Sequence, residues 1–229
     1  MAYILNDPTI FGLQLNVLNV YRLATDIFQQ DFLAVRWANA KDLTDKTYTR
    51  YAAQVGNLDC LTYLHENGCP WDGWTCAAAA YSGHLDCLMY AHEEGCPWDR
   101  RTCDAAARHG HLDCLRYAHE NGCPWNLGTC KEAVRSGHLE ILKYLHENDC
   151  PWNQSICIFA AKYGHLNCLI YLHKQGCPWD KWTSIEAAKN GHLDCLIYMI
   201  ENKCPYDRRS ICNTSHDHIR VYLQKKAIC

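Results

Sequence analysis

The sequence lacks the segments that would direct a chain into or across a membrane. No stretch approaches the roughly 18 uninterrupted apolar residues of a transmembrane helix. The start, MAYILNDPTIFGLQ, has no basic region before an apolar run, so we expect no secretory signal peptide. Charge is also nearly balanced: the net charge is −3 over 229 residues, which gives no overall attraction to nucleic acid or membrane. We therefore expect an intracellular protein with no membrane partner.

Proline is scarce, and its placement reveals a repeat. Six of the seven prolines lie in a Cys-Pro-aromatic motif that recurs every 27 residues. A Gly-Asn/His-Leu motif recurs with the same period, and neither series contains an insertion. The first motif begins at Cys69, Cys96, Cys123, Cys150, Cys177 and Cys204, and the second at Gly56, Gly83, Gly110, Gly137, Gly164 and Gly191. Such a period predicts a repeat architecture.

Each unit is predicted to form two short helices. Thr75, Thr102, Thr129, Thr183 and Ser210 lie where an N-cap is expected, and an Ala-rich segment follows. The Gly of the Gly-His-Leu motif suits a left-handed helix end, and a second helix starts directly after it. This helix is expected to end at a second glycine column, in which Asp149 and Lys203 are exceptions that predict less favourable corners.

Such a helix pair is too short to bury its own apolar face, but stacked pairs can. We therefore predict an all-α solenoid. A column of alanines would let neighbouring helices approach closely: Ala79, Ala106, Ala133, Ala160 and Ala187.

The unit T-C-x-x-A-A-x-x-G-H-L-x-C-L-x-Y-L-H-E-x-G-C-P-W-D resembles the ankyrin repeat. Ankyrin repeats usually have about 33 residues, and the missing part falls where they carry a β-hairpin finger, so the resemblance implies shortened turns. The 27-residue variant is similar to ankyrin proteins of giant DNA viruses, which implies action in an infected host cell (cytoplasm or nucleus) or packaging in a virion.

The period divides the chain into three parts. Residues 45–209 hold about six ankyrin-type repeats, and residues 210–229 are expected to form a degenerate C-terminal capping repeat. Residues 1–44 lie outside the period and predict helices that cap the stack. An alternative for this segment is a degenerate F-box-like docking module, although the usual Leu-Pro start is missing.

Seventeen cysteines could indicate disulfides, metal sites or small core residues. The count is odd and no secretion signal is apparent, so we do not expect disulfides. In the stretch GHLDCLMYAHEEGCPWD, His84, Cys87, His92 and Cys96 have a spacing close to that of a zinc knuckle. However, two histidines eight residues apart on one helix lie about 12 Å apart along its axis, too far to share an ion. We expect no metal and no cofactor.

The Cys-Pro-aromatic motif also supplies a column of tryptophans, from Trp71 to Trp179, with Tyr206 in the last unit. These rings could form a stacking platform for bases or sugars. Alternatively, they cover the seam between repeats where the finger is missing. Their constant type and spacing favour the seam, because recognition residues usually vary between repeats.

Two columns do vary: the turn before the first helix of each unit and the end of that helix. In the ankyrin family these positions face the concave side and bind partners, and here basic and aromatic residues predominate. The candidate partner-binding residues are Trp74, Tyr81, Arg100, Arg101, Arg108, His109, Lys131, Arg135, Lys162, Tyr163, Lys181, Trp182, Lys189, Arg208 and Arg209.

Acidic residues are expected elsewhere, in the first turn and near the end of each second helix. This pattern predicts a basic concave groove and an acidic back. The alternative to a binding groove is that lysine and arginine occur at these positions only because they are well solvated near helix ends.

No catalytic constellation stands out from the repeat, so we predict a non-enzymatic, monomeric scaffold for protein–protein interaction. An acidic or phosphorylated protein segment is the expected partner, and nucleic acid is not expected. Two other functions stay open at this point: a structural or virion-associated component, and a substrate adaptor of a ubiquitin ligase that docks through residues 1–44.

Overall fold

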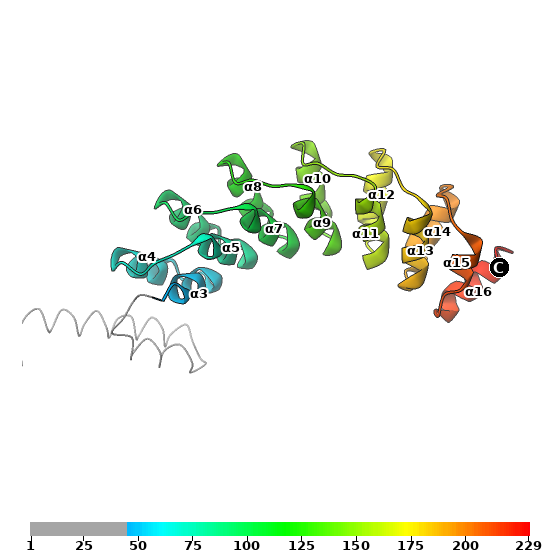
Figure 1. Ribbon diagram of the computed structural model, residues 1–229, viewed down its shortest axis with the longest axis horizontal. Helices are drawn as coiled ribbons and strands as arrows, with labels where there is room; N and C mark the ends of the chain where they lie inside the picture. Colours follow the sequence, from blue (N-terminus) through cyan, green and yellow to red (C-terminus); the bar gives the residue numbers. More distant parts are fainter. Residues whose placement is uncertain (1–44) are drawn as a thin grey trace, which may run out of the picture.

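A computed structural model describes residues 45–229, all of whose regular elements are helices (Figure 1). The predicted cap and its F-box-like alternative at residues 1–44 lie outside the described residues. The first helices of the pairs, called inner helices below, are α3 (Thr47–Val55), α5 (Gly73–Ser82), α7 (Arg100–His109), α9 (Leu127–Arg135), α11 (Ser155–Tyr163), α13 (Lys181–Lys189) and α15 (Arg208–Cys212). The second or outer helices are α4 (Leu58–Glu66), α6 (Leu85–Glu93), α8 (Leu112–Glu120), α10 (Leu139–Glu147), α12 (Leu166–Lys174), α14 (Leu193–Glu201) and α16 (Asp217–Lys225). The predicted all-α repeat solenoid is confirmed.

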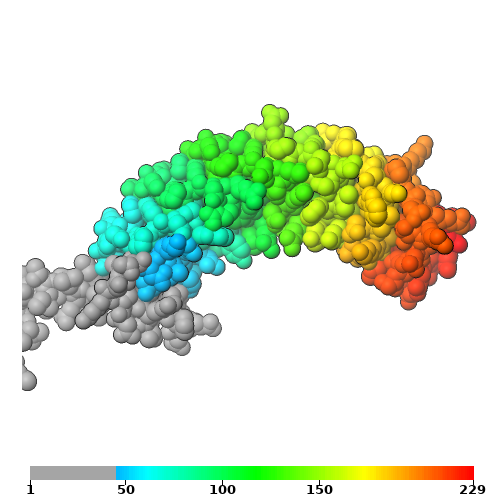
Figure 2. Space-filling view, viewed as in Figure 1, coloured from blue at the N-terminus to red at the C-terminus, as the bar shows by residue number. Residues whose placement is uncertain are grey.

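The stack bends into an arc with the inner helices on its concave side (Figures 1 and 2). Side-chain size accounts for the direction of the bend. Neighbouring inner helices meet through buried alanines such as Ala79 and Ala106, whereas outer helices meet through larger buried residues such as Leu88 and Leu115. Small residues let helix axes approach, so the inner row is the shorter edge of the arc.

The N-caps differ from the prediction. The threonines are not caps: each lies three residues after the cap and is buried, as Thr75 is after Asp72. The Asp72 side chain accepts a hydrogen bond from the backbone N–H of Trp74 at 3.0 Å. In α9 and α13 the threonine hydroxyl accepts a hydrogen bond from the backbone N–H of the cap residue, so each of these helices begins with a capping box. In α5, α7, α9 and α13 the capping residue is thus the last position of Cys-Pro-Trp-Asp/Asn, whereas α11 begins one residue later, after Gln154.

The glycine that ends each inner helix meets two requirements. Gly83 has φ +81, in the left-handed region, as predicted. In addition, a Cβ there would lie against the ring of His111, the residue that precedes α8, the outer helix of the next repeat. The same glycine–histidine contact recurs between successive repeats along the described stack. The Gly-His pair therefore joins one repeat to the next.

The second glycine column also has positive φ, and its two exceptions share that strain. Asp149 and Lys203 both have φ 60. Residues with a Cβ pay an energetic cost in this region, so these corners are less favourable, as predicted. Nothing lies within 4 Å of a Cβ built on Gly95, so a side chain there would meet no neighbouring residue and would carry only the backbone cost.

The repeated cysteines act as small hydrogen-bond donors in the core. The Sγ of Cys96 lies 3.3 Å from the backbone oxygen of Asp72, the cap of the inner helix in its own unit. On the inner helix, the Cys76 thiol lies 4.0 Å from the Cys96 oxygen. In α13 a hydroxyl takes this place: Ser184 donates to the Pro205 oxygen at 3.0 Å. Thiol and hydroxyl are thus interchangeable here.

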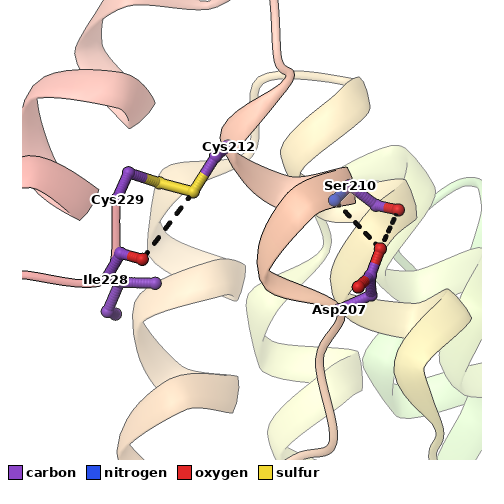
Figure 3. The surroundings of a disulfide bond; sticks show 5 residues. All are labelled: Asp207, Ser210, Cys212, Ile228 and Cys229. Atoms are coloured by element: carbon purple, nitrogen blue, oxygen red, sulfur yellow. Dashed lines mark hydrogen bonds between the residues drawn. A yellow bond between two sulfur atoms is a disulfide. The ribbon is translucent and has the colours of Figure 1, made fainter.

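The C-terminal repeat contradicts the expectation of no disulfides. Cys212, at the end of α15, is bonded to Cys229 after α16, with their Cα atoms 5.9 Å apart (Figure 3). The remaining cysteines are free and buried. The pair stands outside the 27-residue pattern, and only the return of α16 along α15 brings the two sulfurs together.

Gly83→Ala and Gly95→Ala separate the two requirements on glycine, because their φ values, +81 and +82, are nearly equal. Gly95→Ala should lower the free energy of unfolding by about 1 kcal/mol, the cost of a left-handed alanine. Gly83→Ala should lower it by a further ~1–3 kcal/mol, because the new methyl displaces the His111 ring. Urea denaturation followed by circular dichroism measures both, and equal losses would refute the role of the histidine contact.

Cys229→Ser should loosen the last repeat only. The disulfide closes a loop with a sequence separation of 17, which is worth about 3 kcal/mol. Since solenoid repeats are stabilised by their neighbours, hydrogen exchange should accelerate in α15 and α16 but not in α5 to α9. Dithiothreitol should reproduce the effect in the wild type and add nothing in the variant. Unchanged exchange in α16 would show that the bond does not stabilise this end.

Candidate functional site

The tryptophan column covers the seam between repeats. Trp98 stacks on His92 of its own unit, with centroids 3.8 Å apart and planes at 12°. Its edge meets Tyr117 of the next unit, whose hydroxyl lies 2.9 Å from His92 Nδ1. The same His–Trp–Tyr arrangement recurs at the neighbouring seams. The seam interpretation is confirmed for the tryptophans, which are half-buried against the next repeat, but not for Tyr206, which is 42% exposed.

The zinc-like stretch is divided among separate structural roles. His84 precedes α6 and lies against Gly56 of the preceding repeat, whereas His92 belongs to the seam. Cys87 is buried in the core, and burial raises the pKa of its thiol to about 12, so it is neutral and a poor nucleophile. Within residues 45–229, no three side chains of histidine, cysteine or acid gather as a metal ion would need.

The predicted partner-binding residues all lie on or beside inner helices, along the concave side of the arc. Trp74, Tyr81 and Trp182 are large aromatics with 49%, 47% and 54% of their surface exposed. Other exposed members are Arg100, Arg108, Arg135, Lys162, Lys181, Lys189, Arg208 and Arg209, while Arg101, His109, Lys131 and Tyr163 are half-buried. The structure therefore places all of the predicted residues on the inner row of helices.

Charge is unevenly divided between the two rows of helices. Cations outnumber acids on the inner helices, and acids outnumber cations on the outer helices α4 to α14. The expectation that all acids lie elsewhere was wrong, however, because inner helices carry Asp104, Glu132 and Glu186. The concave face is thus cationic but interrupted by acids. The repeat pattern did not indicate these acids, because their positions differ from repeat to repeat.

The acids of the concave face pair with its cations. Glu132 lies between Arg108 and Arg135, with nitrogen–oxygen distances of 3.7 and 3.9 Å. Asp104 lies 3.7 Å from Arg100 in the preceding turn of α7. These exposed ion pairs add little stability. Since one carboxylate serves two guanidiniums at Glu132, positive charge remains for a partner.

Aromatic rings on this face lie close to cations. The Arg101 guanidinium is 4.2 Å from the Trp74 ring centroid, and Arg50 is 6.0 Å from it. Arg135 and Lys162 lie 5.6 and 5.8 Å from the ring of Tyr163. Arg50 was missed by the sequence reasoning because its repeat departs from the consensus in this part.

Ion pairs fix the cap residues at the rim of the face. The Asp72 carboxylate accepts from Arg50 Nε at 3.0 Å and from Lys46 Nζ at 2.9 Å. Burial alone would raise the Asp72 pKa, but the bonds from Arg50 and Lys46 outweigh it and hold that pKa at about 2. A hydrogen bond from Arg101 likewise lowers the pKa of Asp99. Both caps stay charged at neutral pH.

The described residues contain no helix that is long and apolar enough to span a bilayer. The inner helices combine exposed cations with exposed aromatic rings.

Comparisons with known proteins agree with this geometry. Two family models, described as "Ankyrin repeats (3 copies)" and "Ankyrin repeats (many copies)", match residues 130–210 and 76–119. Together they cover more than half of the chain. The crystal structure of the human ASB11 ankyrin repeat domain is similar in fold, with a TM-score of 0.58 and 19% sequence identity over 67% of this chain and 82% of that one. No curated protein matches in sequence.

Asp72→Asn tests the ion pairs separately from the cap, because Asn126 caps α9 equally well. The Asp72 pKa falls from 3.8 to about 2 on folding, so its contribution is present above pH 3.8 and is lost as the pH falls through 2. We expect the variant to be less stable by about 1–2 kcal/mol at pH 7, and this difference to shrink as the pH falls toward 2 and to vanish below it. Urea denaturation across this range measures the difference, and a pH-independent loss would contradict the ion-pair explanation.

Proposed function

Since the chain belongs to the ankyrin repeat family, we propose that it is a non-enzymatic interaction scaffold whose concave face binds an acidic segment of another protein. Ankyrin repeats serve as protein-binding modules. The observation that carries the acidic partner is the separation of charge between the inner and outer helices. Complementary charge selects partners and speeds their encounter, and it rejects partners of like charge.

The concave face also has the composition of a binding surface. Exposed Trp74, Tyr81 and Trp182 occur there among arginines, and tryptophan, tyrosine and arginine are the residues enriched at binding hot spots. The framework residues around them are repeated and buried, so variation between repeats is concentrated on this face. Phosphorylated segments fit the same surface, because Arg108 and Arg135 can present paired donors to a phosphate.

The resemblance of the 27-residue unit to repeats of giant DNA viruses extends the proposal. In that setting the partner is a protein of the infected host cell. This extension rests on the repeat pattern alone, and the concave-face proposal does not depend on it.

A charge reversal on the concave face, with a matched reversal on the convex face, tests the proposal. The triple variant Arg108→Glu, Arg135→Glu, Lys162→Glu changes three inner-helix cations. The control, Arg116→Glu, Lys143→Glu, Lys174→Glu, makes the same change of net charge on α8, α10 and α12. The probe is a fluorescein-labelled peptide of alternating glutamate and serine, unphosphorylated or fully phosphorylated, and the readout is fluorescence anisotropy.

We expect the concave-face variant to bind either peptide at least about tenfold more weakly, and the control to bind as the wild type does. Circular dichroism should show equal helix content in all three proteins. Equal weakening in both variants would show that only net charge matters and would overturn the concave-face assignment. Binding of a single-stranded oligonucleotide in preference to both peptides would instead favour a nucleic-acid partner.

A further inference from the structure

We propose that the hollow between α3, α5 and α7 holds one large apolar side chain, aromatic or aliphatic, of the acidic partner segment and anchors that segment on the concave face. This inference rests on the proposed function and names the second feature that its partner must carry.

The hollow has a volume of about 320 Å³ and combines aromatic walls with an apolar floor. Trp74 and Tyr81 form the walls; they are seven residues apart on α5, which places them on the same side of the helix about 10 Å apart along its axis. Ala77, Ala78 and Ala105 form the floor, and Arg50, Gln54 and Arg101 complete the lining. A space of this size lies at the lower end of ligand sites and suits a side chain better than a chain segment.

The other repeats do not form this hollow: α7 has Arg101 and Arg108 where α5 has its two aromatic walls, and α9, α11 and α13 fill the floor. The position of Ala78 is occupied by Glu132 in α9, Phe159 in α11 and Glu186 in α13. Helix α5, with the sequence GWTCAAAAYS, is also without any charged residue. The concave face therefore has an apolar opening at α5 inside an otherwise charged surface.

The walls are held in place before any partner arrives. Arg101 covers Trp74 at 4.2 Å and is itself fixed by Asp99, with its Nη2 at 2.8 Å from the carboxylate. The Tyr81 ring packs on His109, with centroids 3.9 Å apart. Burial lowers the pKa of His109, which favours the neutral ring in this stack. Since both rings are already ordered, binding of the partner side chain costs little additional entropy from Trp74 and Tyr81.

The cations around the hollow indicate which residues should flank the bound side chain in the partner. Arg50 shares the Asp72 carboxylate with Lys46, so the two cations exceed the one acid that they meet. Arg108, near the end of α7, shares the Glu132 carboxylate with Arg135. A partner therefore fits best when carboxylates flank a phenylalanine, leucine or similar residue.

Two seven-residue peptides that differ only in the central residue test the anchor: Glu-Glu-Glu-Phe-Glu-Glu-Glu and the same peptide with serine at the centre. Both carry a fluorescein label, and anisotropy is measured with the full chain at low and at high salt. We expect the wild type to bind the phenylalanine peptide about tenfold more tightly. High salt should weaken the binding of both peptides but preserve the ratio of their affinities, because salt does not screen an apolar contact.

Three variants locate the anchor. Trp74→Ala should abolish the preference for phenylalanine, and Ala78→Phe should abolish it as well, by filling the hollow with the residue that α11 carries at Phe159. The control is Trp182→Ala, which removes an equally exposed tryptophan at the same repeat position, with Lys181 5.7 Å from its ring. This control should keep the full preference.

Each other outcome overturns the anchor in a distinguishable way. Equal binding of the two peptides by the wild type shows attraction by charge alone, which retains the basic concave face and rejects the hollow. Loss of the preference in Trp182→Ala but not in Trp74→Ala places the anchor elsewhere. Failure of both peptides to bind rejects the acidic partner and the anchor together.

Discussion

A pair of nine-residue helices cannot enclose a core, so every repeat of this protein is folded only against its neighbours. The buried residues reflect that constraint, since Ala79, Leu88 and their equivalents meet the next pair rather than their own partner helix alone. Two ring contacts complete the junctions between successive pairs from α3–α4 to α13–α14. A histidine ring lies on the glycine of the preceding repeat, and a His–Trp–Tyr cluster closes the seam at the turn.

These junctions explain why so many chemically reactive residue types are inert here. Cysteine serves as a small buried group that can donate to a carbonyl, and histidine and tryptophan serve as flat rings that pack across a seam. Because the same contacts recur at successive junctions, these positions hardly vary. The concave side is under no such constraint, and it can carry cations, acids and exposed rings in combinations that differ along the arc.

The period of 27 residues was enough to predict the helix pairs, the glycines that follow them and the solenoid, because a repeated pattern averages out the peculiarities of single positions. The threonine caps were predicted wrongly because threonine is a good capping residue and directly precedes the Ala-rich helix. Asp72 lies three residues earlier, in a turn whose extended backbone places its carboxylate over the first N–H groups. Local preference alone cannot distinguish these two starting points.

The sequence by itself determined the fold and the set of residues available on the concave side. It also determined the curvature, because alanines lie between the inner helices and leucines between the outer helices. Only the tertiary structure decided how these residues combine. The hollow beside Trp74 depends on helices α3, α5 and α7 together, and the Cys212–Cys229 bond depends on the return of α16. The pairing of Glu132 with two arginines likewise joins neighbouring helices. Periodicity describes what successive repeats share, whereas a binding site arises from the contacts in which they differ.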